Sequence, residues 1–144
     1  MHLILGLTVT VLAGLCWGGQ VLSWLVPKTA VRWGLMESEA EVEPVFWSDL
    51  VAEARWDAAA LWPMTVCGAL LTFDHGAWPY FGLIGAGSYV YFAGRGITTR
   101  LAMRARGFRI GSTGNVTTGL VALAVWGAMA AVVMVAAIVD LAGR

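Results

Sequence analysis

The chain has 144 residues, of which 59% are hydrophobic and only 12% are charged, and nine basic side chains balance nine acidic ones. Soluble domains usually carry roughly 25% charged residues, so this composition, with a mean hydropathy of +0.75, excludes an ordinary soluble domain and places the chain in the membrane class. The balanced net charge gives no reason to expect a nucleic-acid partner.

Four apolar runs follow one another along the chain and indicate four membrane crossings; the second run, 58–73, is short but belongs to a longer helix. A helix needs about 20 residues to cross the hydrocarbon core. The predicted helices cover about 3–26, 45–73, 78–94 and 115–140. The first run lacks the basic start and the cleavage site of a signal peptide, so we expect it to be retained. The sequence therefore predicts one all-α transmembrane domain over residues 1–144, a four-helix bundle in the lipid bilayer.

The second predicted helix is longer than its apolar part, which covers 58–73. We expect its first turns, from Val45, to project from the membrane. Pro63 should kink this helix, because proline lacks an N–H and its ring crowds the carbonyl group of Ala59.

The basic residues concentrate on one side of the predicted membrane domain. Segments 27–57 and 95–115 hold eight of them, whereas the other side holds only Arg144. Because short cytoplasmic loops carry an excess of Lys and Arg, the loops 27–44 and 95–114 should be cytoplasmic and both termini outside. We expect a multi-pass protein of the cytoplasmic (inner) membrane of a bacterium.

The two predicted cytoplasmic loops have opposite charge. Segment 27–57 is acidic, and segment 95–115 contains five arginines and no acid. The loops should therefore pair with each other or across subunits, and the arginines also orient the adjacent helices and attract anionic headgroups. For the acidic residues of 37–57 we favour solvated or arginine-paired carboxylates. A divalent-cation site stays an alternative, but the spacing lacks an EF-hand pattern and we assign no metal site.

The central parts of the four predicted crossings contain no ionisable residue, which disfavours a proton-driven pump. Haem is not expected, because both histidines fall near the outer ends of crossings. Small residues spaced four apart indicate close packing of helices within or between chains. These pairs are Gly14 with Gly18, Gly82 with Ala86, and Gly127 with Ala131. The best candidates for polar contacts between helices or for a ligand cleft are Gln20, Ser23, Tyr89 and Tyr91.

The motif YVYFAGRG at 89–96, followed by a basic loop and by Ser112 at the start of the last helix, resembles the MAPEG superfamily of membrane proteins of eicosanoid and glutathione metabolism. The four predicted crossings and the long first cytoplasmic loop are also similar to that family. The resemblance implies a homotrimer that holds glutathione or a related thiol between subunits and takes a lipophilic substrate from the bilayer. It implies Arg109 and Ser112 as catalytic residues that stabilise the thiolate, because a nearby arginine favours ionisation of a thiol.

The resemblance also implies a set of cofactor-binding residues, namely Arg95, Arg55, Asp57 and Tyr91. In the stretch EARWDAAALWP, however, Arg55 and Asp57 stand where the family has histidine and asparagine, and Ala60 replaces a glutamate. This departure removes groups that bind the thiol in the family, so the chain is interpreted as a MAPEG-like enzyme or as an inactive relative.

Two other classes of function stay open at this point. One is a non-catalytic accessory subunit that packs on a larger membrane complex through its glycine faces. The other is a small channel or facilitator lined by Gln20, Ser23 and the tyrosines. The sequence does not identify the substrate, the solute or the partner protein.

Overall fold

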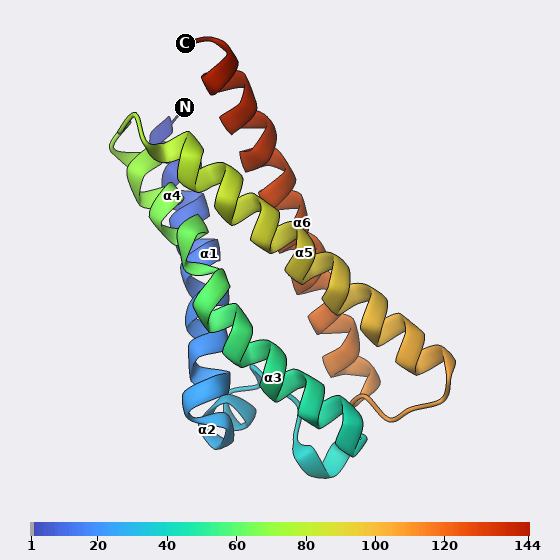
Figure 1. The fold of residues 1–144 in the computed structure, drawn as a ribbon. Coiled ribbons are helices and arrows are strands. Elements are labelled where there is room, and N and C mark those ends of the chain that lie inside the picture. Colours follow the sequence, from blue (N-terminus) through green and yellow to red (C-terminus); the bar gives the residue numbers. More distant parts are fainter. Residues whose placement is uncertain (1) are drawn as a thin grey trace.

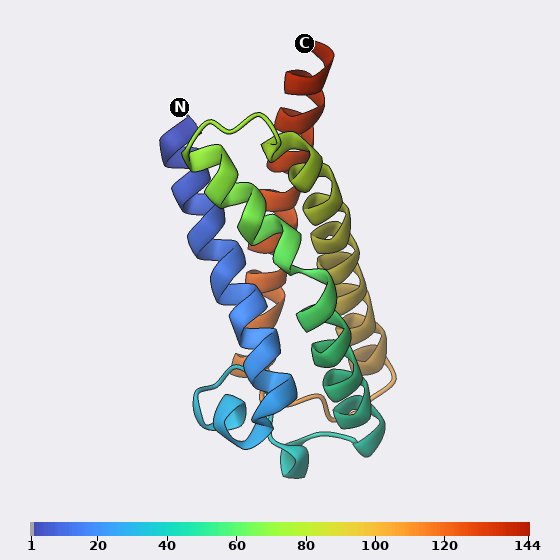
Figure 2. The ribbon, with the colours of Figure 1, turned by 60° about the vertical axis from the view of Figure 1, so that its left-hand side comes forward.

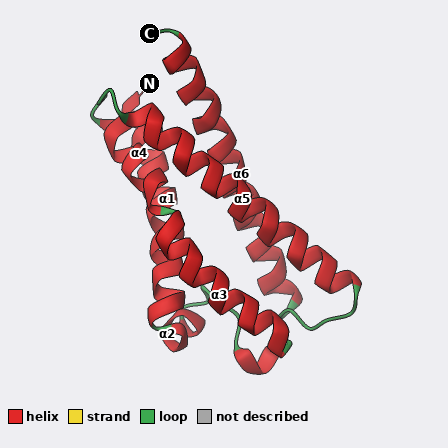
Figure 3. Ribbon diagram, viewed as in Figure 1, coloured by secondary structure: helices red, strands yellow, loops and turns green. Residues whose placement is uncertain are grey.

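The computed structural model describes residues 2–144 and is helical, with no β-strand in that range (Figure 1, Figure 3). The helices are α1 (His2–Leu25), α2 (Pro27–Arg32), α3 (Pro44–Ala60), α4 (Trp62–Thr72), α5 (Trp78–Ala105) and α6 (Thr113–Ala142), with a short 3₁₀ helix η1 (Glu39–Glu41). The prediction of an all-α chain is confirmed. Helices α1 and α6 are each long and apolar enough to cross a membrane.

The long helices run side by side in alternating directions (Figure 1, Figure 2). Both termini and the turn at 73–77 lie at one end of the molecule, which we call the turn end. Helix α2, η1 and the connection 106–112 lie at the other end, which we call the loop end. Helix α5 packs along α6 and α4, and α1 packs along α4.

The second predicted helix is divided into α3 and α4 at Leu61. The predicted kink at Pro63 is confirmed, because α3 ends at Ala60 and Pro63 lies in the first turn of α4. Trp17 of α1 donates a hydrogen bond from Nε1 to the carbonyl oxygen of Ala58 over 2.8 Å. A carbonyl group near the break therefore has a partner on another helix.

Helices α1 and α4 approach each other through two glycines that face two threonines. A Cβ atom on Gly6 would lie 2.5 Å from the backbone nitrogen of Thr72, and one on Gly68 would lie 2.5 Å from that of Thr10. Both threonine hydroxyls donate to their own helix, to the carbonyl oxygens of Gly6 and Gly68, over 2.8 Å. The contact is thus reciprocal, and only glycine allows the two backbones to come this close.

The small-residue pairs picked out in the sequence make weaker contacts. Gly82 and Gly127 do lie in helix contacts, and a Cβ atom on Gly127 would lie 3.1 Å from the Cβ of Ala93. A Cβ atom on Gly18 would meet nothing within 4 Å, and Ala131 is exposed. Spacing alone therefore found only part of the helix-packing surface.

The loop end has a small hydrophobic core of its own, separate from the core that runs along the bundle. Its buried members are Ala30, Met36, Val42, Phe46, Leu50, Ile110 and Val116. Val42 and Ile110 form an isolated antiparallel bridge, and the Glu43 N–H donates to the carbonyl oxygen of Arg109 over 2.8 Å. The predicted pairing of the two loops is confirmed.

Two boundaries differ from those expected. Helix α5 continues to Ala105 instead of ending at 94, and the first loop contains α2 and η1. The sequence change from apolar to basic at Arg95 suggests the end of a helix. Arginine is a good helix former, so a change of polarity need not end the helix.

Candidate functional site

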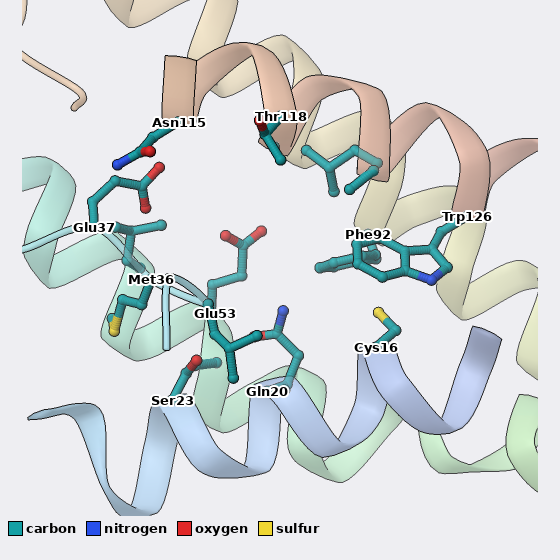
Figure 4. Close-up of a pocket in the computed structure, with 18 of the residues that line it drawn as sticks. Cys16, Gln20, Ser23, Met36, Glu37, Glu53, Phe92, Asn115, Thr118 and Trp126 are labelled. Carbon is teal, nitrogen blue, oxygen red and sulfur yellow. The ribbon is translucent and has the colours of Figure 1, made fainter. Parts of the chain in front are cut away.

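A cavity of about 260 Å³ lies inside the loop end of the bundle, between α1, α3, α5, α6 and residues 34–37 (Figure 4). Its polar lining includes Gln20, Ser23, Glu37, Glu53, Asn115 and Thr118. Its apolar lining includes Cys16, Phe92, Leu123 and Trp126. Figure 4 shows Glu37 and Asn115 toward one side of the cavity and Cys16, Phe92 and Trp126 toward the other. The cavity is therefore amphipathic.

Helical spacing explains how two helices line this cavity. Cys16, Gln20 and Ser23 follow one another at intervals of three or four residues and so share one face of α1. The same spacing brings Asn115, Thr118 and Ala122 of α6 to the opposite wall. Gln20 and Ser23, the candidates for interhelical polar contacts or for a ligand cleft, thus both line this cavity.

Aromatic side chains close the deep end of the cavity. Phe92 packs against Trp126 with ring centroids 6.2 Å apart and against Tyr89 with centroids 6.1 Å apart. Trp126 donates from Nε1 to the carbonyl oxygen of Leu12 over 3.1 Å, and the Tyr89 hydroxyl donates to that of Ala13 over 3.0 Å. Because both polar tips have partners on α1, the aromatic wall is held in a defined position. Tyr89 thus makes the interhelical polar contact expected of it.

An ion-pair cluster joins α3 and α5 beside the cavity. Arg95 donates from Nη1 to Glu53 and from Nη2 to Asp49. The carboxylates of Glu53 and Asp49 thus compensate the charge of the Arg95 guanidinium. Glu53 lines both the cavity and a hollow on the outer surface of the bundle. The cluster therefore forms the wall between the two.

Arg100 also lines the cavity. Its Nη1 donates to the carbonyl oxygen of Gly96 over 3.2 Å, and its guanidinium carbon lies 5.7 Å from the centroid of the Phe46 ring. Its Nε is buried without a hydrogen-bond partner among the residues that the structure describes. Arg100 therefore brings a positive charge to a cavity that also contains the carboxyl groups of Glu37 and Glu53.

The outer hollow lies between α3 and α5 and opens on the surface of the bundle. It has two adjoining parts, of about 460 and 310 Å³, which share Trp56, Asp57 and Tyr91. Asp57 is 3% exposed, and its Oδ2 has no hydrogen-bond partner within residues 2–144. We call this surface feature the α3–α5 hollow.

Asp57 changes one expectation from the sequence. It precedes the second apolar run, but packing places it beside Ser88 and Tyr91, which belong to the third predicted crossing at 78–94. The prediction that the central part of each apolar run lacks ionisable residues holds along the sequence, but it did not foresee that Asp57 of α3 lines a hollow together with residues of another run. The neighbours of a residue depend on the helix packed beside it and not only on its own run.

The residues proposed to bind a thiol cofactor are only partly brought together. Arg95, Asp57 and Tyr91 share the α3–α5 hollow. Arg55 is exposed on α3 and lines neither the hollow nor the cavity.

The residues proposed as catalytic lie elsewhere, at the loop end. Arg109 is exposed and pairs with Glu43 over 3.3 Å. Ser112 is the N-cap of α6, and its hydroxyl oxygen accepts a hydrogen bond from the Asn115 N–H over 3.2 Å. Within one chain, both residues thus have structural roles, and neither lines the cavity or the hollow.

Several cavity residues escaped the sequence analysis, above all Glu37, Asn115, Thr118 and Trp126. The spacing of polar residues in the first two turns of α6 is the signal that could have found Asn115 and Thr118.

No group of three or more His, Cys, Asp or Glu residues able to hold a metal ion occurs within 2–144. Comparison of the chain with family models, with curated proteins and with solved structures finds no match.

Proposed function

We propose that this chain is a four-pass membrane protein that binds a small amphiphilic molecule in the cavity between α1, α3, α5 and α6. In this arrangement α1, α3 with α4, α5 and α6 each cross the bilayer, the loop end is cytoplasmic and both termini are outside. The excess of basic residues at the loop end supports this orientation.

The outer surfaces of α1 and α6 support insertion in a bilayer. Large apolar side chains are exposed over the length of both helices, far beyond the patches that soluble monomers expose. On α1 they are Leu3, Ile4, Leu7, Val11 and Leu15, and on α6 they are Val121, Val125, Val132, Val135, Ile138 and Val139. Lipid tails are the surroundings that such surfaces fit.

The observation that carries the proposal is the amphipathic lining of the cavity (Figure 4). Ligand sites are concave and mostly apolar, with a few polar groups that orient the ligand. An apolar part of the ligand would lie near Phe92 and Trp126, and its polar group would face Gln20 and Thr118. The volume of about 260 Å³ is below the usual range for drug-sized ligands, so the bound part of the molecule is small.

A pair of neighbouring glycines allows a matched test. Gly18 and Gly19 both lie in α1, and a Cβ atom on either would meet nothing within 4 Å, but only Gly19 lines the cavity. We expect native mass spectrometry of protein extracted from its own membrane to show a bound amphiphile on the wild type and on Gly18→Leu. Gly19→Leu should lack this mass, because its side chain fills the cavity. A ligand-free wild type, or a ligand retained by Gly19→Leu, contradicts the proposal.

A second candidate function is a MAPEG-like enzyme, or an inactive relative, that uses glutathione or a related thiol on lipophilic compounds. One observation favours it: Arg95, Asp57 and Tyr91 share a hollow on the surface of the bundle, where another subunit of a homotrimer would close it. Arg95 is already paired with Asp49 and Glu53, however, which leaves little positive charge for a thiolate. This function requires a trimer by native mass spectrometry and glutathione binding that Arg95→Ala abolishes.

A further inference from the structure

We infer that the α3–α5 hollow is a second binding site, separate from the cavity lined by Gln20 and Trp126, for an organic cation that carries a lipophilic part. Asp57 would be the counter-ion of the cation, and Trp56 and Tyr91 would be its aromatic walls. The site takes a ligand of opposite charge to the thiolate of glutathione.

The state of Asp57 is the first reason. Its carboxyl group is nearly fully buried, and Oδ2 has no donor within the part of the chain that the structure describes. Burying a polar group without a hydrogen bond costs free energy, and burying an unpaired charge costs more. A bound ammonium group would remove this cost, since it supplies both positive charge and, if protonated, N–H donors.

The local balance of charge is the second reason. Asp49 and Glu53 both pair with Arg95, so the guanidinium that lines the hollow is already compensated. Asp57 lines both parts of the hollow and adds a further acidic group. The hollow therefore has an excess of acid, which favours cations and disfavours anions.

The aromatic walls are the third reason. Trp56 is 65% exposed and Tyr91 is 61% exposed, and both residues line both parts of the hollow together with the buried Asp57. Aromatic faces attract ammonium groups, most strongly where water is excluded. Gly87 leaves room beside them, because a Cβ atom there would meet nothing within 4 Å. In the four-pass arrangement the hollow faces lipid, so the cation would arrive sideways from the bilayer.

The test uses the purified full chain in detergent and two probes of the same shape. Benzyltrimethylammonium is cationic, and neopentylbenzene is its neutral counterpart with carbon in place of nitrogen. We expect saturation-transfer NMR to detect the cation on the protein and to show much weaker binding of the neutral probe. Asp57→Asn should weaken cation binding by at least about tenfold, and Tyr91→Leu should weaken it by about threefold.

Two control variants separate the site from general effects. Tyr80→Leu removes another exposed aromatic residue of α5, and Asp140→Asn removes an acid from α6; neither residue lines the hollow. Both should bind the cation as the wild type does. Tyr91 is mostly exposed, so Tyr91→Leu gives a readout even if Asp57→Asn disturbs folding. Equal binding of the two probes, or undiminished binding by a folded Asp57→Asn protein and by Tyr91→Leu, would overturn the inference.

Discussion

Arg95 joins two helices that otherwise touch little, and it does so with a single guanidinium group. It pairs with Asp49 and Glu53, which lie one helical turn apart on α3. Planar guanidinium groups suit such two-sided pairing because their donors lie in a fixed fork. Since Glu53 lines both the cavity and the α3–α5 hollow, the pairing keeps these two spaces apart.

The ion pairs of Arg95 and the ion pair of Arg109 should differ in their contribution to stability. Arg95→Ala leaves Glu53, whose side chain is 10% exposed, without its partner, and should lower the free energy of unfolding by roughly 1 to 3 kcal/mol. Arg109→Ala breaks an exposed pair and should cost less than about 1 kcal/mol. Reversible unfolding in mixed micelles measures both. Equal losses for the two variants would show that Arg95 is only a surface charge.

At the scale of elements, contact between α1 and α4 depends on backbone approach. Gly6 and Gly68 face Thr72 and Thr10 in a reciprocal arrangement. When helices associate in lipid, burying apolar surface contributes little, because lipid tails are as apolar as leucine. Close packing of the backbones contributes the stabilisation instead. The break at Leu61 sets the direction of α4 separately from that of α3, as Figure 2 shows.

An alanine at this contact should destabilise the protein even though alanine is the better helix former. Gly68→Ala places Cβ within 2.6 Å of the backbone nitrogen and hydroxyl of Thr10, so α1 must move away, at a cost of roughly 1 to 3 kcal/mol. Gly94→Ala is the control in α5, where a Cβ atom would meet nothing within 4 Å. It should stabilise by up to about 1 kcal/mol. The unfolding midpoints of the two variants and the wild type are compared in one detergent. A stabilised Gly68→Ala protein would mean that α1 and α4 lie further apart than the structure shows.

At the scale of the whole molecule, the distribution of basic residues and the positions of the two termini support the same orientation in the membrane. The termini and the turn at 73–77 lie at one end, and the arginine-rich connection between α5 and α6 lies at the other (Figure 1). Eight of the nine basic residues belong to segments 27–57 and 95–115. This asymmetry is the main support for the proposed orientation, which the positive-inside rule makes cytoplasmic at the loop end.

Accessibility to a membrane-impermeant maleimide tests this orientation. Gly76→Cys at the turn end should react in sealed right-side-out vesicles, and Ala105→Cys at the loop end should react only after the vesicles are opened. Cys16 and Cys67 are buried and serve as internal background in both variants. Reaction of Ala105→Cys in sealed vesicles would reverse the orientation or remove one crossing.

The sequence by itself determined the features that depend on composition and local chain geometry. It predicted the all-α class, the kink at Pro63 and the pairing of the acidic loop with the basic one. It also picked out Gln20 and Ser23 as candidates for interhelical polar contacts or a cleft, and both line the cavity. Each of these follows from a property of one segment, such as a missing N–H, a helical spacing or a local charge. Such properties act over a few residues and are visible in the order of amino acids.

Only the tertiary structure decided which faces meet and at what depth. It placed Asp57 beside Tyr91 and brought Gly6 to Thr72. It also separated Arg109 from the hollow that contains Arg95. Periodicity shows that a helix has a packing face, but the partner and its register depend on shape complementarity between residues far apart in the chain. For this reason the candidate binding sites, which lie between helices, emerged only from the packed bundle.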